Sequence, residues 1–357
     1  MSAKSADSLA SIRWVCAAIS PLVVVHPPQP GLSTVPPDWD DIMHVASAHL
    51  VLPNLYLGLQ AKGLLNEVPV EFCETLDGFK CLNTLRNARL RRQMLEVSTA
   101  LNAAGVSPIW LKGANNLMPA DWLHSGRMML DLDLWLPDPA QRNTALTCLE
   151  RLGYLVPDEY SDVNFDSSQH LAPRLRDGEA AQIELHRTIV HPQVAPLLPD
   201  REALARVDWF DWEGERVGRL NLTDRLMHSY IQCTEMSGDA MFRARIPLMK
   251  VLDFVELAIT SGDAFRSNAF LGKLEQSPWC SRSRQFLTYV AHDFGLASPL
   301  PFDGSYLLRR RLAREFPRLM YGRLFLSRVD CVFREGRIGS PLHWWPRLSN
   351  FLSNYSR

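Results

Sequence analysis

The spacing of hydrophobic and polar positions divides the chain into a helical beginning, a strand-rich centre and a helical end. In the first part, apolar residues recur three and four positions apart, which is the period of an amphipathic helix. The clearest such helix ends at Gly105, and one of its faces carries Leu90, Met94, Val97 and Leu101. The same period returns from residue 220 onward.

Shorter apolar runs in the centre predict strands. Residues 107–111 form one such run, which ends at the pair Lys112-Gly113. Residues 128–136 alternate strictly, with leucines on one face and a second face made of Met129, Asp131, Asp133 and Trp135. Residues 170–189 are typical of a hairpin with its bend at Asp177-Gly178, and they place Gln182, Glu184 and His186 on one face.

A helix is expected between the second strand and the hairpin. Asp138 is its N-cap, Pro139 takes its first position and Gly153 follows its end. The whole pattern predicts an α+β fold in which a small mixed sheet is flanked by helices. We expect an N-terminal helical region at 1–104, a core at 105–200 and a C-terminal helical region at 201–357.

Charge changes this picture at the C-terminus only. The 357 residues carry a net charge of -1, which argues against a generally basic nucleic-acid binder. Residues 305–357, however, hold 11 arginines against three acidic residues. This segment could meet an acidic partner, and the plainer alternative is a solvated arginine face on a helix.

Cysteine usage and hydropathy bear on the compartment. The seven cysteines are scattered and form no C-x-x-C pair, which argues against a disulfide framework and a thiolate zinc site. Apolar runs stay shorter than the ~20 residues of a membrane span. We therefore expect a cytoplasmic protein without a membrane partner.

The acidic pair in the second strand is the strongest chemical signal. Residues i and i+2 of a strand share a face with Cα atoms ~6.6 Å apart, so the carboxylates of Asp131 and Asp133 can converge. Two ionised carboxylates this close need a cation between them, and Mg²⁺, with Mn²⁺ as the alternative, suits carboxylates and phosphates. Glu184 lies in a second strand with alternating residues, and its position there would allow it to supply a third carboxylate. The alternative for each acid is a solvent-facing strand edge.

These motifs resemble a known family. The stretches "WLKGANNLMPADWLHSGRMMLDLDLWL" and "IELHRTI" are similar to uncharacterised bacterial nucleotidyltransferases of the DNA polymerase β-like superfamily. Those proteins share a Leu-Lys-Gly turn, an Arg shortly before Asp-hydrophobic-Asp, and a later Glu-hydrophobic-His. With the helical flanks, the resemblance covers about residues 40 to 260.

The resemblance implies a role for each matching residue. Asp131 and Asp133 would bind the metals, and Glu184 would bind the metal next to the nucleophile or act as its base. Gly113 would keep the backbone open to a triphosphate. Lys112 and Arg127 would neutralise phosphate charge.

The chain departs from the superfamily in the glycine turn. Gly-Ser is usual there, whereas this chain has Gly113-Ala114-Asn115, and 17 residues separate Gly113 from Asp131. The amide of Asn115 or Asn116 is the candidate replacement for the missing hydroxyl. His186 either contacts a phosphate, orients a carboxylate or is structural. His228 and Asp253 could close the cleft or serve only in packing and capping.

Three functions follow from this evidence. The first is a metal-dependent transfer of a nucleoside monophosphate (NMP) from a nucleoside triphosphate (NTP) to a hydroxyl or phosphate acceptor, with release of pyrophosphate. The acceptor could be a small molecule, a peptide or protein, or an RNA end, and the mostly acidic body of the chain favours the first two. The second is a non-catalytic nucleotide- or partner-binding module on the same fold. The third, nucleic-acid binding through residues 305–357, ranks last because basic and aromatic residues are not interleaved there.

Overall fold

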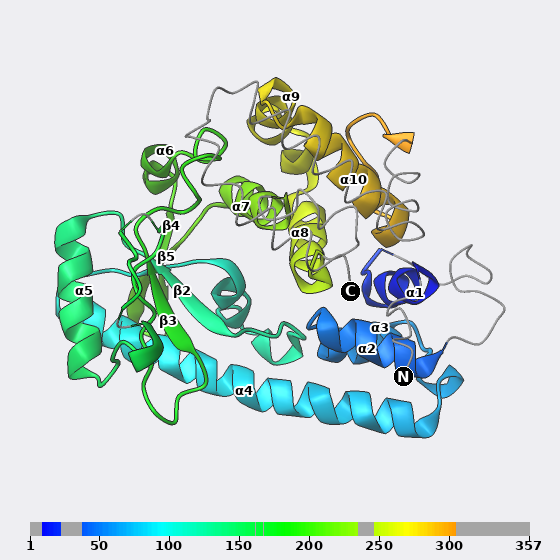
Figure 1. The fold of residues 1–357 in the computed structure, drawn as a ribbon, viewed down its shortest axis with the longest axis horizontal. Coiled ribbons are helices and arrows are strands. Elements are labelled where there is room, and N and C mark those ends of the chain that lie inside the picture. Colours follow the sequence, from blue (N-terminus) through cyan, green and yellow to red (C-terminus); the bar gives the residue numbers. More distant parts are fainter. Residues whose placement is uncertain (1–8, 23–37, 161, 167, 235–245, 305–357) are drawn as a thin grey trace, which may run out of the picture.

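The computed structural model describes residues 9–22, 38–160, 162–166, 168–234 and 246–304 (Figure 1). Within them, helices flank one five-stranded mixed sheet, which confirms the predicted α+β class. The division into three regions stays a prediction. The basic segment 305–357 lies outside the described residues, so its acidic partner also stays a prediction.

The sheet has the strand order β3-β2-β1-β5-β4. Its members are β1 Ile109–Trp110, β2 Asp131–Trp135, β3 Gln182–His186, β4 Asp208–Trp212 and β5 Glu215–Arg219. β2 and β3 run parallel, as do β1 and β5, whereas β1–β2 and β4–β5 are antiparallel pairs. The carboxylate-bearing strands β2 and β3 therefore lie side by side at one edge.

Some strand predictions need correction. β1 and β2 are shorter than the runs 107–111 and 128–136. The expected hairpin forms with its bend at Gly178 (φ 80), but its first arm pairs only through isolated bridges such as Arg174–Ile183. The hairpin β4–β5 was missed because residues 201–357 were expected to be helical. Its two-residue turn has positive φ at both positions, as a tight hairpin requires.

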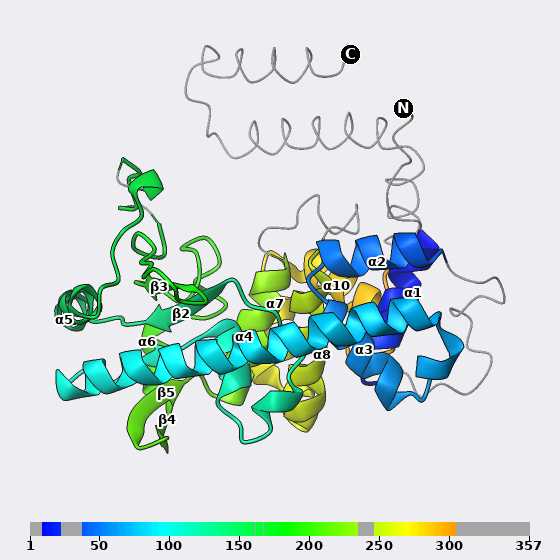
Figure 2. The same cartoon turned by 90° about the horizontal axis from the view of Figure 1, so that it is seen from below.

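The N-terminal helices are α1 Leu9–Ile19, α2 Trp39–Ala48, α3 Leu52–Ala61 and α4 Val70–Ala103. Pro53 lies in the first turn of α3, where its missing N–H costs nothing. The 34-residue α4 contains the helix that was expected from Leu82 to Gly105, and it already begins at Val70. Figure 2 shows α4 running from α1–α3 to the sheet, so one helix connects both parts.

The remaining helices are α5 Pro139–Arg151, α6 Asp200–Ala205, α7 Leu222–Thr234, α8 Leu248–Ser261, α9 Lys273–Gln276 and α10 Cys280–Phe294. The α5 start is as predicted, because the Asp138 side chain accepts a hydrogen bond from the Ala140 N–H at 2.9 Å. No single helix among the described residues has the length and apolar character to cross a membrane. Only α2 and α3 taken together, bent by 120°, meet those criteria.

Two hydrophobic clusters hold these elements together. One joins the sheet to α4 and α5 and includes Leu132, Leu134 and Leu185. The other joins α1–α3 to α7, α8 and α10 and includes Trp135 and Tyr230. The alternation of β2 thus sends its leucines to the first cluster and its opposite face toward the second.

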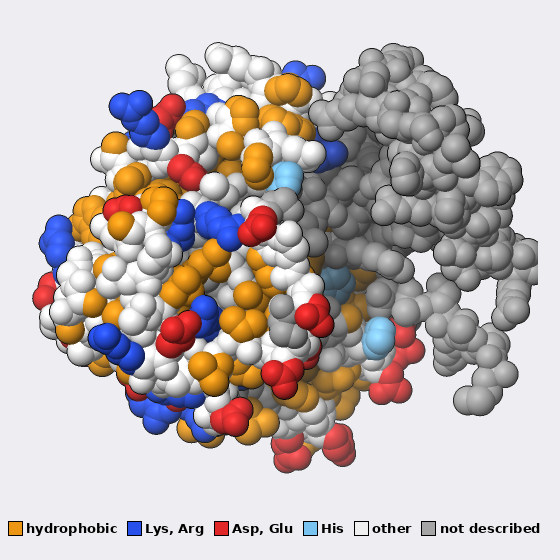
Figure 3. All heavy atoms as spheres, turned by 60° about the vertical axis from the view of Figure 1, so that its left-hand side comes forward, with side chains coloured by type: hydrophobic (Ala, Val, Ile, Leu, Met, Phe, Trp, Pro, Cys, Tyr) orange, Lys and Arg blue, Asp and Glu red, His pale blue; other side chains and the backbone are white. Residues whose placement is uncertain are grey.

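The surface carries charges of both signs. In the view of Figure 3, Lys and Arg side chains lie among Asp and Glu side chains, with hydrophobic side chains scattered between them.

Candidate active site

The acidic site is built by the parallel pair β2–β3. Asp133 shares the face of β2 that carries Trp135, because side chains two positions apart in a strand point the same way. The register places Glu184 directly opposite Asp133 and His186 opposite Trp135. Asp133 and Glu184, one predicted carboxylate from each strand, therefore face one small region.

Asp133 is the best-connected residue of the site. Its side chain is 2% exposed, and its Oδ1 accepts hydrogen bonds from Lys112 Nζ at 2.5 Å and from His186 Nε2 at 2.8 Å. Burial alone would favour the neutral acid, but the Lys112 ammonium and the hydrogen bond from His186 outweigh it. They hold the pKa of Asp133 well below its usual range. Asp133 is thus a buried, ionised carboxylate.

Glu184 has the opposite electrostatic environment. Burial, and then the negative charges of Asp133 and Asp131, raise the pKa of Glu184 above its ordinary value. Burial and the charge of Asp133 also raise the pKa of Asp131. These two carboxylates repel their neighbours, and a bound cation would relieve that repulsion.

Ligand atoms of Asp133, Glu184 and His186 all lie within 4.8 Å of one another. Two carboxylates and an imidazole fit a divalent cation by their donor chemistry. Asp131 is not part of this group of three, although it starts the same strand. The structure therefore brings together two of the three predicted metal ligands and adds His186. That histidine is fully buried and orients Asp133, one of the roles considered for it.

The turn after β1 carries the next predicted residues. It is a 3-10 helix, Lys112–Leu117, that begins with a positive φ of 50° at Lys112. The buried Asn115 donates its amide to the carbonyls of Trp110 and Lys112 at 3.3 and 3.2 Å. Asn115 thus holds the turn that aims Lys112 at Asp133.

Close packing explains why residue 113 is a glycine, and this reason was not predicted from the sequence. A Cβ at this position would lie 2.6 Å from Met129 Sδ and 3.5 Å from Arg127 Cζ. Any larger residue would force the buried Met129 side chain to shift, so glycine suits the close approach of the turn to the segment before β2. Its predicted openness to a triphosphate stays a prediction.

Arg127 reaches across to α8. Its Nε donates to both carboxylate oxygens of Asp253, at 2.9 and 2.8 Å, and its guanidinium also contacts the Met249 sulfur. If Arg127 neutralises a phosphate, as predicted, its guanidinium would have to bind that phosphate and Asp253 at the same time. The structure thus pairs Arg127 with Asp253, which sequence analysis had considered only for closing the cleft or for packing.

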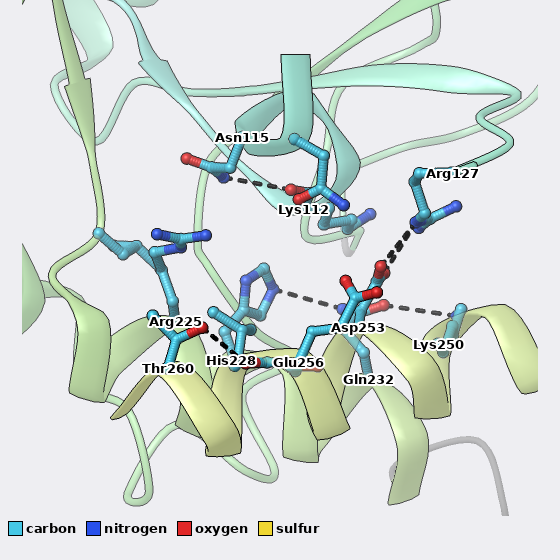
Figure 4. Close-up of a pocket in the computed structure, with 14 residues that line it drawn as sticks. Lys112, Asn115, Arg127, Arg225, His228, Gln232, Lys250, Asp253, Glu256 and Thr260 are labelled. Atoms are coloured by element: carbon cyan, nitrogen blue, oxygen red, sulfur yellow. Dashed lines mark hydrogen bonds and ion pairs between the residues drawn. The ribbon is translucent and has the colours of Figure 1, made fainter. Parts of the chain in front are cut away.

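A pocket of about 200 Å³ separates the Lys112 turn from α7 and α8 (Figure 4). The turn and the segment before β2 contribute Lys112, Asn115, Asn116 and Arg127. The helices contribute Arg225, His228, Gln232, Lys250, Asp253 and Glu256, among others. A larger hollow of about 560 Å³ adjoins it through shared lining residues and extends toward α1 and α3. His228, buried beside Lys112 and His186, has its pKa lowered to about 3 and is neutral.

The comparisons with known proteins address this site. A family described as uncharacterised nucleotidyltransferase matches residues 36–295. The chain belongs to this family. No curated protein and no solved structure matches it. The region shared with other uncharacterised nucleotidyltransferases includes β2, β3, the Lys112 turn and both pocket-lining helices.

Several residues that line the pocket were not predicted from the sequence of this family member. Arg225, Gln232 and Lys250 were not singled out, because polar residues on a helix are ordinary. The available signal was their spacing. On α7 the polar lining residues follow i, i+3, i+4 and i+7, at Arg225, His228, Ser229 and Gln232.

Proposed function

We propose that this protein transfers an NMP from an NTP to a hydroxyl or phosphate group of a small molecule, peptide or protein, releasing pyrophosphate. The observation that carries the proposal is the meeting of Asp133, Glu184 and His186 across two parallel strands. Membership in a nucleotidyltransferase family supports it, and so does the likeness to polymerase β-like enzymes. A cytoplasmic location belongs to the same proposal.

In this proposal Asp133, Glu184 and Asp131 hold Mg²⁺ or Mn²⁺. When bound, the cation polarises the attacking oxygen and neutralises the leaving pyrophosphate. Asp133 supplies a permanent negative charge, because Lys112 and His186 keep it ionised. His186 fixes the orientation of that carboxylate from a fully buried position.

The chain's own residues then carry the transfer. The acceptor oxygen forms a bond to the α-phosphorus, while the bond from that phosphorus to the bridging oxygen breaks. Glu184, the carboxylate directly opposite Asp133, takes the acceptor's proton. Lys112, Asn115 and the pocket wall position the nucleotide, so the catalysis lies mainly in positioning and charge neutralisation.

The test uses NTPs labelled at the α-phosphate, with small-molecule, peptide and protein fractions as acceptors. Wild type should label an acceptor and release pyrophosphate only with the divalent cation. Glu184→Gln should reduce the rate at least about 100-fold. The matched control is Glu67→Gln at an exposed carboxylate, which should keep full activity. Equal activity of Glu184→Gln would contradict the proposed role.

One observation favours a second candidate, a non-catalytic nucleotide- or partner-binding module. Lys112 Nζ lies 2.5 Å from Asp133 Oδ1, so a lysine already neutralises the carboxylate that a cation would need. This candidate expects nucleotide binding that is the same with Mg²⁺ and with EDTA. It also expects no pyrophosphate release with any acceptor.

A further inference from the structure

The pocket wall opposite the Lys112 turn consists of two polar stripes. Arg225, His228 and Gln232 lie on one face of α7, and Lys250, Asp253 and Glu256 on one face of α8 (Figure 4). The other faces of both helices are apolar and buried in the larger hydrophobic cluster. The helices therefore present their polar side chains to the pocket.

Among the described residues, four cationic side chains line this pocket, and two of these four form ion pairs with carboxylates. Lys112 is paired with Asp133, and Arg127 is paired with Asp253. Over the described parts of the chain, Arg225 makes no side-chain hydrogen bond or ion pair, and Lys250 reaches only Gln232 Oε1 at 3.5 Å. Two positive charges thus line the pocket without an ion pair among the described residues, although the Asp253 and Glu256 carboxylates line the same pocket.

Their surroundings disfavour these charges. Both side chains are partly buried. Burial, and then the neighbouring Arg219, lowers the pKa of Arg225. Burial, and then Lys112 and Arg127, lowers the pKa of Lys250. Partly desolvated cations that repel other cations cost stability, and an anionic ligand would remove that cost.

We infer that Arg225 and Lys250 form a phosphate-binding subsite on the α7–α8 wall, apart from the Lys112-Gly113 turn. Two sources could supply the phosphate, namely the tail of the NTP or a phosphate group of the acceptor. The inference rests on the proposed function for its ligand class. The Glu256 carboxylate lines the same pocket and in its ionised form opposes an anion there, although burial raises its pKa to about 7.

The experiment titrates the full-length chain by calorimetry with three probes. These are inorganic tripolyphosphate, each NTP with Mg²⁺, and inorganic phosphate added to the NTP-loaded protein. The test variant is the double substitution Arg225→Gln and Lys250→Gln. Arg201→Gln removes an exposed arginine of α6 and is the matched control. Glu256→Gln removes the opposing carboxylate.

We expect the double variant to weaken phosphate binding at least tenfold, since each charged hydrogen bond is worth about that factor. Arg201→Gln should bind like wild type, and Glu256→Gln should bind more tightly. Loss of tripolyphosphate and NTP affinity identifies the nucleotide tail as the source. Unchanged NTP affinity with loss of inorganic phosphate binding identifies the acceptor.

Anion binding that is absent from wild type, or unchanged in the double variant, overturns the inference. The proposed function can fail separately. Tripolyphosphate binding that depends on Arg225 and Lys250, together with no NTP binding and no pyrophosphate release, would support the subsite and refute the transferase. Metal-dependent NTP binding, together with tripolyphosphate and inorganic phosphate binding that are both unchanged in the double variant, would refute the subsite and leave the transferase standing.

Discussion

At the scale of single residues, Asp133 and Glu184 face each other across two strands, yet their pKa values shift in opposite directions. The difference lies in their partners. Asp133 accepts hydrogen bonds from Lys112 and His186, which favour its ionised form. The pKa of Glu184 is raised mainly by burial and by the negative charges of its neighbours. One carboxylate therefore stabilises the folded chain without a cation, and the other destabilises it.

This contrast predicts that Glu184→Gln stabilises the cation-free protein. Because the pKa of Glu184 is raised on folding, its ionised form costs stability at neutral pH. That cost disappears as the pH falls toward the ordinary carboxyl range, where the unfolded chain is protonated too. Urea unfolding at pH 7.5 should give a gain of up to about 1 kcal/mol, which fades near pH 4. If Glu184→Gln lowers the free energy of unfolding, or raises it only as much as Glu67→Gln does, the pKa of Glu184 is not raised by folding.

Asp133→Asn should have the opposite effect. It leaves the Lys112 ammonium, whose side chain is 21% exposed, without its carboxylate, which costs about 3 kcal/mol. Because the pKa of Asp133 is lower in the folded chain than in the unfolded chain, its ionised form stabilises the fold at every pH above the ordinary pKa of an aspartate. This stabilisation is lost as the pH falls through the pKa of Asp133 in the folded chain. The gap between wild type and variant should therefore narrow in acid. Asp138→Asn is the control, because asparagine also caps a helix well. Equal stabilities for the two variants would contradict the buried ion pair.

At the scale of elements, the 3-10 turn Lys112–Leu117 positions the site by close packing. Gly113→Ala should cost about 1–3 kcal/mol, because its Cβ would overlap Met129 and force the turn away from β2. Gly78→Ala, where a Cβ within α4 meets nothing within 4 Å, should instead stabilise by about 0.5–1 kcal/mol. Thermal unfolding of both variants decides this. A Gly113→Ala protein as stable as wild type would mean that the turn is not tightly packed.

Features of the fold and the site that involve residues close together in the sequence were predictable, whereas contacts between residues far apart in the sequence were not. Strand alternation has a period of two, so the sequence predicted which face of its strand carries Asp133. The same alternation predicted that Glu184 and His186 share one face of a second strand. The Asp138 cap is equally local. The contacts Lys112–Asp133 and Arg127–Asp253 span 21 and 126 residues, and no local pattern encodes them. The predicted helix did not include residues 70–81 of α4, and this part contains Gly78, a residue type that weakens a helical pattern.

At the scale of the whole molecule, the pocket lies between parts built on different clusters. The Lys112 turn belongs to the sheet side, and α7 and α8 belong to the larger helical cluster. The Arg127–Asp253 ion pair is a direct charged link between them, with side chains 11% and 21% exposed. The relative position of the carboxylates and the pocket wall thus depends on this pair.

Arg127→Gln should therefore lower both stability and nucleotide affinity. Losing charged hydrogen bonds to Asp253 costs about 1.5–3 kcal/mol and frees the α8 wall. Arg206→Gln is a matched control, because it removes an Arg–Asp pair, with Asp224, outside the pocket. It should lower stability only. If NTP affinity falls equally in both variants, the link across the pocket has no special role.

The most direct test of the account is calorimetric binding of each NTP to wild type and to Glu184→Gln, with Mg²⁺ and with EDTA. Glu184→Gln suits this test, since it is expected to fold at least as stably as wild type. The account predicts binding to wild type that requires Mg²⁺ and falls at least about tenfold in the variant. NTP binding that is the same with EDTA and the same in Glu184→Gln would contradict a metal–nucleotide site on these strands.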